Sequence, residues 1–351
     1  MLKSLCFSKK ILAEIEKCYA CLGKTVNGEP CLFFAGEGDG SVHAFLGESF
    51  ERHETIWQGG GGTMGIVAIP GHDEWTLVSR GFYSMVDCGE STIEIVRDAG
   101  GHFTHEPIAA LPYLHRFGAL KAQDGTLYLV DASLHRGKAD KADWSKPGHL
   151  YWAQLPDNME KPFHVDFQPF EGEYYQNHGF CTACVGGIGA AYTSSREGVF
   201  AIVPPANRGG AWTVTQLMDF PVSDIAVTDL DGDGKAEIAA LSPFHGNRCR
   251  VYKDLGEGYE VIYTYPLPDD FFHTILSATL GGAPVFIGGA RKLTSDLFLL
   301  RWDAQAQAVV SQQIDVGQGP SNAAVLNLPQ RDILLAANRM VAQAAIYEFP
   351  R

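Results

Sequence analysis

The amino-acid sequence predicts an all-β fold, a seven-bladed β-propeller that forms one domain over residues 1–351. The first observation is a pattern of short apolar runs and turns that recurs at intervals of about 50 residues. The second is that the last unit is one strand short, while the apolar residues around Ile11 can supply the missing strand. An N-terminal strand in that place closes the ring and removes exposed sheet edges. A β-sandwich is the alternative, but it does not explain seven units of similar length.

Each unit begins with an apolar strand, passes through a polar turn and returns through a second strand. Six units begin at Met64, His115, His178, Asp224, His273 and Asn322. One further period toward the N-terminus reaches Lys17, where apolar runs over 19–22 and 31–34 flank an Asn-Gly turn. The unit from Asp224 also shows a third strand over 250–252 and a fourth over 259–265. Four short strands of this kind make one propeller blade.

The longest unit contains an insertion at positions 135–148, which is rich in charge and ends in Pro-Gly. We expect it to be a loop that protrudes from one face of the ring. Long loops inside compact domains are often functional.

The composition limits the function classes. The 39 glycines and 18 prolines indicate many turns, and the net charge of −14 argues against nucleic acid as a partner. No apolar run has the length of a membrane span, and the charged N-terminus is not typical of a signal peptide. Eight cysteines in a chain of 351 residues do not indicate a disulfide framework. We therefore expect a cytoplasmic protein that binds no membrane.

An aspartate-rich stretch at 229–238 joins two apolar runs that read as strands. Alternating carboxylates separated by glycines are typical of an oxygen-ligand loop for a hard cation, Ca²⁺ or Mg²⁺. The expected ligands are the side chains of Asp229, Asp231, Asp233 and Glu237, with the carbonyl of Lys235. An EF-hand would need flanking helices and a glutamate where Ala240 stands. A plain Asp-Gly hairpin turn is the other alternative.

This strand–loop–strand unit resembles the FG-GAP or VCBS repeat, a blade unit of β-propellers. The resemblance is specific over about fifteen residues around the loop. It implies a structural calcium ion in this blade.

The strand starts should converge around the central channel, on the face opposite the aspartate loop. Three of them are His115, His178 and His273, and a fourth is Asp224. Imidazoles suit a divalent transition metal such as Zn²⁺, Mn²⁺ or Fe²⁺, and Asp224 or water could complete the set of ligands. The alternative is that these histidines are hydrogen-bonded structural residues.

The ends of the second strands reach the same face and carry further chemistry. Arginines there suit the binding of a carboxylate or a polarised oxygen, and histidine or lysine can act as base or acid. The candidate catalytic residues are His245, His135, Lys138, Arg80, Arg291 and Arg339. The alternative is that the arginines only solvate the rim. The order of base and acid stays open.

Four motifs together are similar to the propeller domain of aldos-2-ulose dehydratase. They are the aspartate loop, Leu114-His115-Arg116-Phe117, Asn177-His178-Gly179 and Pro243-Phe244-His245-Gly246. The resemblance implies removal of water from a keto-sugar, although this chain lacks the cupin domains that follow in that family. Oligogalacturonide lyases, which are propellers with a histidine-held metal, are similar in the type of site only.

The sequence therefore favours a metal-dependent carbon–oxygen lyase, a dehydratase or β-eliminase, acting on a keto-sugar or oxidised glycoside. The expected partner is a small carbohydrate, and the oligomeric state stays open. One alternative is a non-catalytic propeller that binds a glycan or a protein and holds a structural calcium ion. Another is a sugar hydrolase or epimerase on the same scaffold.

Overall fold

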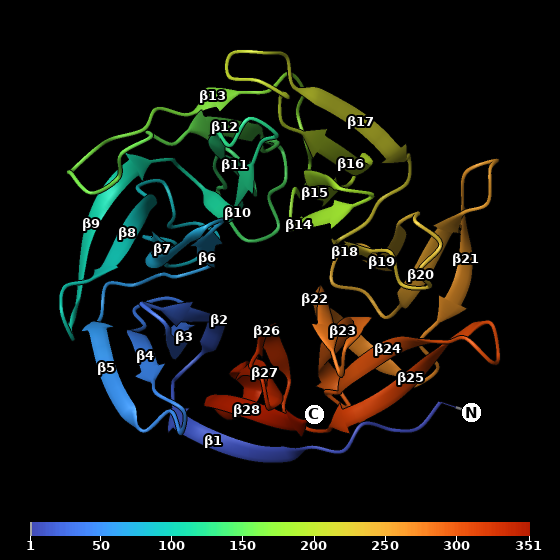
Figure 1. Cartoon of the computed structure of the whole chain (residues 1–351). Coiled ribbons are helices and arrows are strands. Elements are labelled where there is room, and N and C mark those ends of the chain that lie inside the picture. The colour runs from blue at the N-terminus through green and yellow to red at the C-terminus, as the bar shows by residue number, and fades with distance from the viewer. Residues whose placement is uncertain (1) are drawn as a thin grey trace.

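A computed structural model describes residues 2–351, and these form seven antiparallel sheets of four strands each, arranged in a ring (Figure 1). Within six of the blades, each strand pairs with the next one along the chain, from the channel outward, so these blades are simple meanders; the seventh takes its outer strand from the N-terminus. The predicted seven-bladed β-propeller is confirmed.

The strands of the first four blades run from the inner to the outer edge as follows. They are β2 (Cys18–Val26), β3 (Glu29–Gly36), β4 (Val42–Leu46) and β5 (Arg52–Trp57); β6 (Ile66–Ile69), β7 (His72–Arg80), β8 (Thr92–Asp98) and β9 (Phe103–Ala110); β10 (Leu114–Lys121), β11 (Leu127–Ser133), β12 (Leu150–Gln154) and β13 (Gln168–Pro169); β14 (Gly179–Val185), β15 (Ile188–Ser195), β16 (Gly198–Val203) and β17 (Thr213–Met218).

The last three blades follow the same order, and one short 3-10 helix lies in the final blade. They are β18 (Asp224–Thr228), β19 (Glu237–Leu241), β20 (Cys249–Asp254) and β21 (Tyr259–Thr264); β22 (Asp269–Leu280), β23 (Ala283–Leu293), β24 (Leu297–Asp303) and β25 (Ala308–Asp315); β26 (Pro320–Asn327), β27 (Arg331–Asn338), η1 (Arg339–Val341), β28 (Gln343–Pro350) and β1 (Ser8–Glu14).

The ring closes through the N-terminus, as the sequence predicted. Strand β1 pairs antiparallel with β28, with Ser8 opposite Glu348 and Glu14 opposite Gln343. Residues before β1 continue along the sixth blade, where the amide of Leu5 donates to Gln312 Oε1 at 2.9 Å. The first and last parts of the chain thus share one sheet, which covers the edge that β28 would otherwise expose.

The hydrophobic core lies between neighbouring blades. The interface between the first and last blades shows the principle, since Phe34 of β3 and Leu335 of β27 are fully buried in one cluster. Successive side chains of a strand point to opposite faces of its sheet, so a strand buried on both faces is apolar throughout. Strand β3 meets that condition from Cys31 to Ala35.

The inner strands of four blades carry a β-bulge in their first half. The ladder skips Tyr19 in β2, His115 in β10, His273 in β22 and Ser321 in β26. A bulge leaves one residue unpaired and re-aims its side chain. Four equivalent bulges around one channel therefore direct these residues toward the axis.

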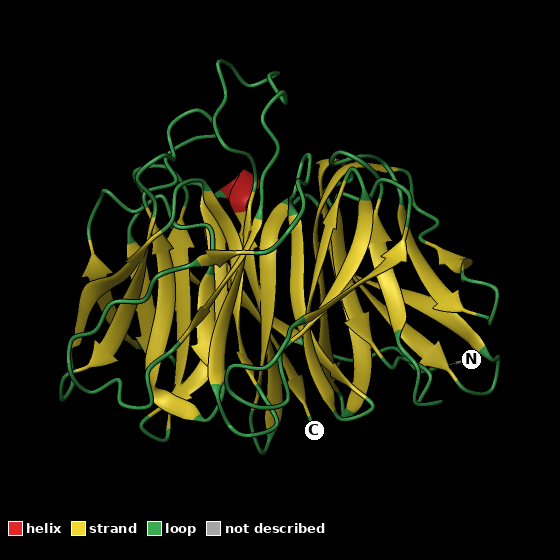
Figure 2. Cartoon of the chain, turned by 90° about the horizontal axis from the view of Figure 1, so that it is seen from above, coloured by secondary structure: helices red, strands yellow, loops and turns green. Residues whose placement is uncertain are grey.

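The two faces of the ring differ in their loops. Figure 2 shows long loops rising on the side that carries η1, while the C-terminus lies on the opposite side. The insertion at 135–148 is irregular, with isolated bridges between His135 and Pro147 and between Gly148 and Tyr174, and it leaves the end of β11 on the η1 side. Within the described residues 2–351, no helix is long and apolar enough to cross a membrane.

Candidate metal centre

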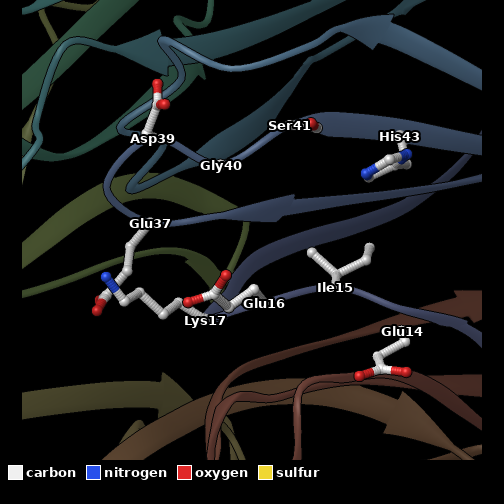
Figure 3. A pocket seen from close by; sticks show the side chains of 9 residues that line it. All are labelled: Glu14, Ile15, Glu16, Lys17, Glu37, Asp39, Gly40, Ser41 and His43. Carbon is white, nitrogen blue, oxygen red and sulfur yellow. The ribbon is translucent and has the colours of Figure 1, made fainter.

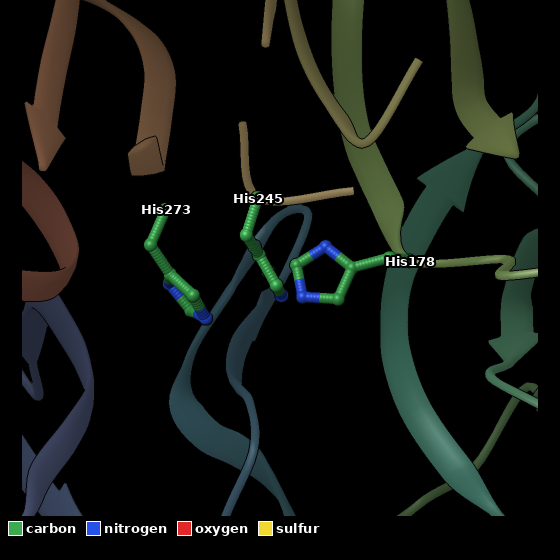
Figure 4. A group of neighbouring side chains, drawn as sticks. All are labelled: His178, His245 and His273. Atoms are coloured by element: carbon green, nitrogen blue, oxygen red, sulfur yellow. The ribbon is translucent and has the colours of Figure 1, made fainter. Parts of the chain in front are cut away.

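Three histidines meet at the channel on the η1 face. Each of His178, His245 and His273 offers a ring nitrogen, and these nitrogens all lie within 4.8 Å of one another. Figure 4 shows the three rings converging from separate segments of the chain. The ring of His245 stacks on that of His273, with centroids 4.8 Å apart, and stands at 90° to that of His178. Such a group can hold one metal ion.

Backbone carbonyls fix the tautomers of two of these histidines. Nδ1 of His178 lies 3.1 Å from the carbonyl of Ser223, and Nδ1 of His273 lies 2.8 Å from that of Ser321. A carbonyl only accepts, so each Nδ1 carries the proton and each Nε2 keeps its lone pair. Metal-binding histidines almost always have a partner of this kind on the other nitrogen. Both carbonyls come from the next blade, so the packing of blades orients both rings.

His245 reaches the cluster from the turn after β19 with a positive φ of 53°. Its ring also stacks on Phe271 at 4.6 Å, and its buried Nδ1 has no hydrogen-bond partner. Burial, followed by the nearby Arg291 guanidinium, lowers the pKa of His245 to about 3. Burial likewise holds the pKa values of His178 and His273 well below the ordinary value. All three imidazoles are therefore neutral at pH 7, as metal ligation requires.

His115, which the sequence suggested as a ligand, lies beside this group rather than in it. Its ring centroid is 4.6 Å from that of His178 and its edge faces Phe82. Its Nδ1 is buried without a partner, and burial holds its pKa well below the ordinary value. His245, suggested as a catalytic residue, is instead the third member of the converging set. His115 is thus a neutral imidazole beside the three converging histidines.

Asp224 lies on the protonated side of His178. Its Oδ2 is 3.5 Å from His178 Nδ1 and 3.6 Å from an Arg116 nitrogen. Burial raises the pKa of the Asp224 carboxyl to about 7, although Arg116 and backbone amides act in the opposite direction. This placement suits a residue that orients His178 rather than one that binds the ion directly.

Sequence reasoning missed two residues of the centre, Tyr19 and Arg116. The Tyr19 hydroxyl lies 3.3 Å from His273 Nε2. The guanidinium carbons of Arg116 and Arg291 stand 5.9 Å and 5.6 Å from the Tyr19 ring centroid. Aligning the repeats correctly could have found Tyr19, because it occupies the bulge of β2 that is equivalent to the bulge of β10 at His115. The expected start at Lys17 lay two residues too early.

Three of the other suggested catalytic residues are arginines, and they differ in whether an acidic side chain already pairs with them. Arg339 pairs with Glu37, and Arg80 donates to the carbonyl of Gly60 at 2.9 Å and lies 3.8 Å from Glu94. Arg291 has no acidic partner of this kind; it donates to the Ser321 hydroxyl, and burial lowers its pKa to about 10. Arg291 is therefore the arginine of the three best placed to meet an anionic group in the channel.

His135 and Lys138 begin the insertion and lie at the edge of the channel. The amide of Gly137 donates to His135 Nδ1 at 2.9 Å, so the proton of the neutral ring is on Nε2, 4.0 Å from Cys88 Sγ. Burial, followed by Lys138, lowers the pKa of His135 to about 4. The ammonium of Lys138 lies 3.2 Å from the centroid of Trp144. Trp144 in turn contacts Phe244 at 5.0 Å between ring centroids, so the insertion reaches the turn that carries His245.

The aspartate loop lies in the β18–β19 turn, on the face away from the histidines. Asp229, Asp231 and Glu237 offer oxygens within 4.8 Å of one another, a set that fits a hard cation. The ammonium of Lys253 also lies here, 2.8 Å from Asp233 and from Glu237 and in contact with Asp231. Burial works to lower the pKa of Lys253, but these hydrogen bonds outweigh it and raise the pKa.

The turn itself is held by its own aspartates. Asp229 accepts from the amides of Gly232 and Gly234 at 2.8 and 2.9 Å, and Asp233 accepts from that of Lys235 at 2.9 Å. Both glycines have φ above 80°, which only glycine adopts without strain. The loop therefore keeps its shape through hydrogen bonds from backbone amides to its aspartates as well as through the ammonium of Lys253.

A separate pocket of about 410 Å³ opens near the first blade (Figure 3). Its lining includes Glu14, Glu16, Glu37 and Asp39, and no histidine of the channel cluster. Glu37 is already paired with Arg339. The pocket is thus distinct from the metal centre.

No protein-family model and no curated protein sequence matches this chain. Among solved structures, the crystal structure of the Saccharomyces cerevisiae Sqt1 is similar, with a TM-score of 0.50 and 12% sequence identity, covering 98% of each chain. At this level of identity the likeness supports the propeller fold alone.

Proposed function

We propose that this protein is a metal-dependent carbon–oxygen lyase that acts on a keto-sugar or oxidised glycoside at the channel. The observation that carries the proposal is the group of three neutral histidines, two of them buried and one half-buried, in which His178 and His273 donate from Nδ1 to a carbonyl and therefore carry no proton on Nε2. This is the ligand chemistry of Zn²⁺, Mn²⁺ or Fe²⁺. Bound there, such an ion would polarise a substrate carbonyl or carboxylate and acidify the adjacent C–H bond.

The surrounding residues supply the other requirements of a β-elimination. Arg116 and Arg291 place two cationic groups at the channel, where they can bind the oxygen that gains negative charge. Neutral His115 is outside the ligand group and has a free Nδ1, so we assign it as the base that accepts the carbon-bound proton. The Lys138 ammonium lies beside Trp144 at the channel edge and burial lowers its pKa, so we assign it as the acid that protonates the leaving oxygen.

We propose in addition that the chain is a propeller of the FG-GAP or VCBS type, close in its site to the propeller domain of aldos-2-ulose dehydratase. In this proposal Ca²⁺ binds the aspartate loop as a structural ion and displaces the ammonium of Lys253. The oxygens of Asp229, Asp231 and Glu237 support it. A cytoplasmic location is part of the same proposal, supported by eight cysteines that are all free thiols in the described chain.

Elemental analysis of the purified protein, followed by assay on a panel of keto-sugars and uronic-acid glycosides, tests the proposal. We expect about one equivalent of a transition metal and an unsaturated product. Protein that takes up no transition metal even after incubation with Zn²⁺ or Mn²⁺ would instead support the second candidate, a non-catalytic binding propeller. The aromatic pair Trp144–Phe244 at the channel edge is the observation that favours that candidate, because such rings can stack on a glycan.

A further inference from the structure

We infer that Tyr19 supplies the fourth donor atom of the metal centre, through its phenol oxygen. The inference rests on the proposed function only in requiring an ion at the three histidines. It adds an oxygen ligand from the first blade, so that the ion would join the first, fourth, fifth and sixth blades.

The first argument is distance. The Tyr19 oxygen lies 3.3 Å from His273 Nε2, the nitrogen whose lone pair faces the channel. Two atoms that each bind one tetrahedral ion at about 2.0–2.1 Å are about 3.3–3.4 Å apart. The Tyr19 oxygen and His273 Nε2 therefore already have the separation of neighbouring ligands.

The second argument is the anchoring of Tyr19. Its bulge removes it from the ladder, and the side chain of Asn322 donates to its backbone carbonyl at 2.7 Å. Asn322 accepts from Arg116 at 2.8 Å, and Arg116 lies 3.6 Å from Asp224, which contacts His178. A chain of polar contacts thus sets the position of Tyr19 relative to a ligand on the other side of the site. Ligands held in this way by their neighbours are typical of metal centres.

The third argument is electrostatic. Tyr19 is 2% exposed, and the guanidinium groups of Arg116 and Arg291 face its ring from within 6 Å. The buried Nε atoms of both arginines have no hydrogen-bond partner. A phenol oxygen bound to an ion would release its proton to solvent and carry negative charge, which the two guanidinium groups would offset, although burial is the larger effect and raises the pKa of Tyr19. A tyrosine with only a packing role would not need two half-buried cations beside it.

Iron provides a direct probe, because a phenolate bound to Fe³⁺ gives a visible charge-transfer band that imidazole does not give. The protein would be stripped of metal, loaded with Fe²⁺ in the absence of air and oxidised. We expect the band in the wild type, its loss in Tyr19→Phe and its retention in Tyr128→Phe, which removes another buried hydroxyl far from the channel. Resonance Raman spectra of the wild type, which need no variant, should show phenolate vibrations on excitation in the band.

Zinc affinity gives a second readout. Loss of an outer-shell partner of a metal ligand usually costs about 10–100-fold in affinity, so loss of a ligand should cost more than about 100-fold. We expect this drop for Tyr19→Phe and no change for Tyr128→Phe, measured by competition with a chromophoric chelator. A wild-type protein that binds iron at the histidines without the band, or a Tyr19→Phe protein that keeps the band and the zinc affinity, overturns the inference and leaves the proposed function standing. A wild-type protein with no transition metal at the histidines overturns both.

Discussion

The two faces of the propeller hold two different groups of potential metal ligands. On the η1 face, the three histidines are neutral, two of them are buried and one is half-buried, and a ring nitrogen of each lies within 4.8 Å of the others. On the opposite face, the carboxylates of the aspartate loop are charged and already surround the ammonium of Lys253. The comparison teaches that the carboxylates already hold a cation, the Lys253 ammonium, whereas under our proposal a metal ion would supply the cation at the histidines. A metal should therefore be essential to the first site and exchangeable with a side chain in the second.

The largest effect is expected from the channel histidines. His178→Ala, His245→Ala and His273→Ala should each lower the affinity for the central metal by more than about 100-fold and abolish lyase activity. Folding should survive, because the apolar faces of the strands are unchanged. Metal content and thermal melting measured side by side test this, with exposed His164→Ala as a control.

His115→Ala separates the ligands from the base. It should abolish activity and keep the full complement of metal, because His115 lies beside the ligand group. Loss of the metal in this variant would instead return His115 to the ligand set.

The opposite face should respond to Lys253→Met. Without calcium, this change leaves Glu237 fully buried and unpaired, and breaking a buried ion pair costs about 3–5 kcal/mol. Added Ca²⁺ should restore most of the loss by taking the place of the ammonium. Denaturant unfolding with calcium and with chelator measures both quantities. If calcium stabilises neither Lys253→Met nor the wild type, the cation of this loop is Lys253 alone.

Lowering the pH should reduce the free energy of unfolding of the metal-free protein, because the histidines at the channel are neutral in the folded state. The unfolded chain protonates its histidines below about pH 6.5, while His245 and His135 stay neutral in the fold until about pH 3 and 4. Stability is therefore lost as the pH falls below 6.5, by about 2 kcal/mol for His245 alone between pH 6.5 and 5. The Asp224 carboxyl acts in the opposite direction. Because its pKa in the folded protein is raised to about 7, its protonation stabilises the folded protein as the pH falls toward 4.

Denaturant unfolding across this pH range tests the sum, in which the carboxyls of Asp224 and Asp131, whose pKa values burial raises, oppose several imidazoles. His245→Gln should flatten the pH dependence, and added Zn²⁺ should raise stability at pH 7 more than at pH 5. A stability that rises between pH 6.5 and 5 would contradict neutral channel histidines.

The smallest effect is expected from Asp231→Ala. The loop keeps its backbone hydrogen bonds and Lys253 keeps two carboxylates, so the loss should be about 1–3 kcal/mol. Activity should be nearly unchanged, because the loop is on the other face. Melting at the wild-type temperature with and without chelator would show that this carboxylate has no structural role.

The blades and their closure were predictable because the signals are local. Apolar runs, Asn-Gly and Asp-Gly turns and a fixed period are all visible in sequence, and the missing strand of the last unit required a partner such as β1. The insertion at 135–148 was visible as a charged segment with few apolar residues. Each of these features depends on a few neighbouring residues.

The composition of the metal centre was less predictable, because it depends on bulges and on ring direction. A one-residue bulge at Tyr19 changes which side chain faces the axis, and no residue type marks it in the sequence. His245 comes to the ligand group through a positive φ in a turn, which sets the direction of its ring. The sequence alone does not show that Lys253 reaches the aspartate loop. Its place there follows from strand register, because Lys253 stands directly opposite Glu237 in the β19–β20 ladder.

X-ray absorption of the zinc-loaded protein tests the central claim most directly, because it reports the atoms that surround the ion. We predict a first shell at about 2.0–2.1 Å, with the multiple scattering of three imidazoles and one further oxygen. The His178→Ala protein should lose the imidazole signal. A shell of oxygen atoms alone in the wild type would place the ion at carboxylates and contradict a histidine-held metal in the channel.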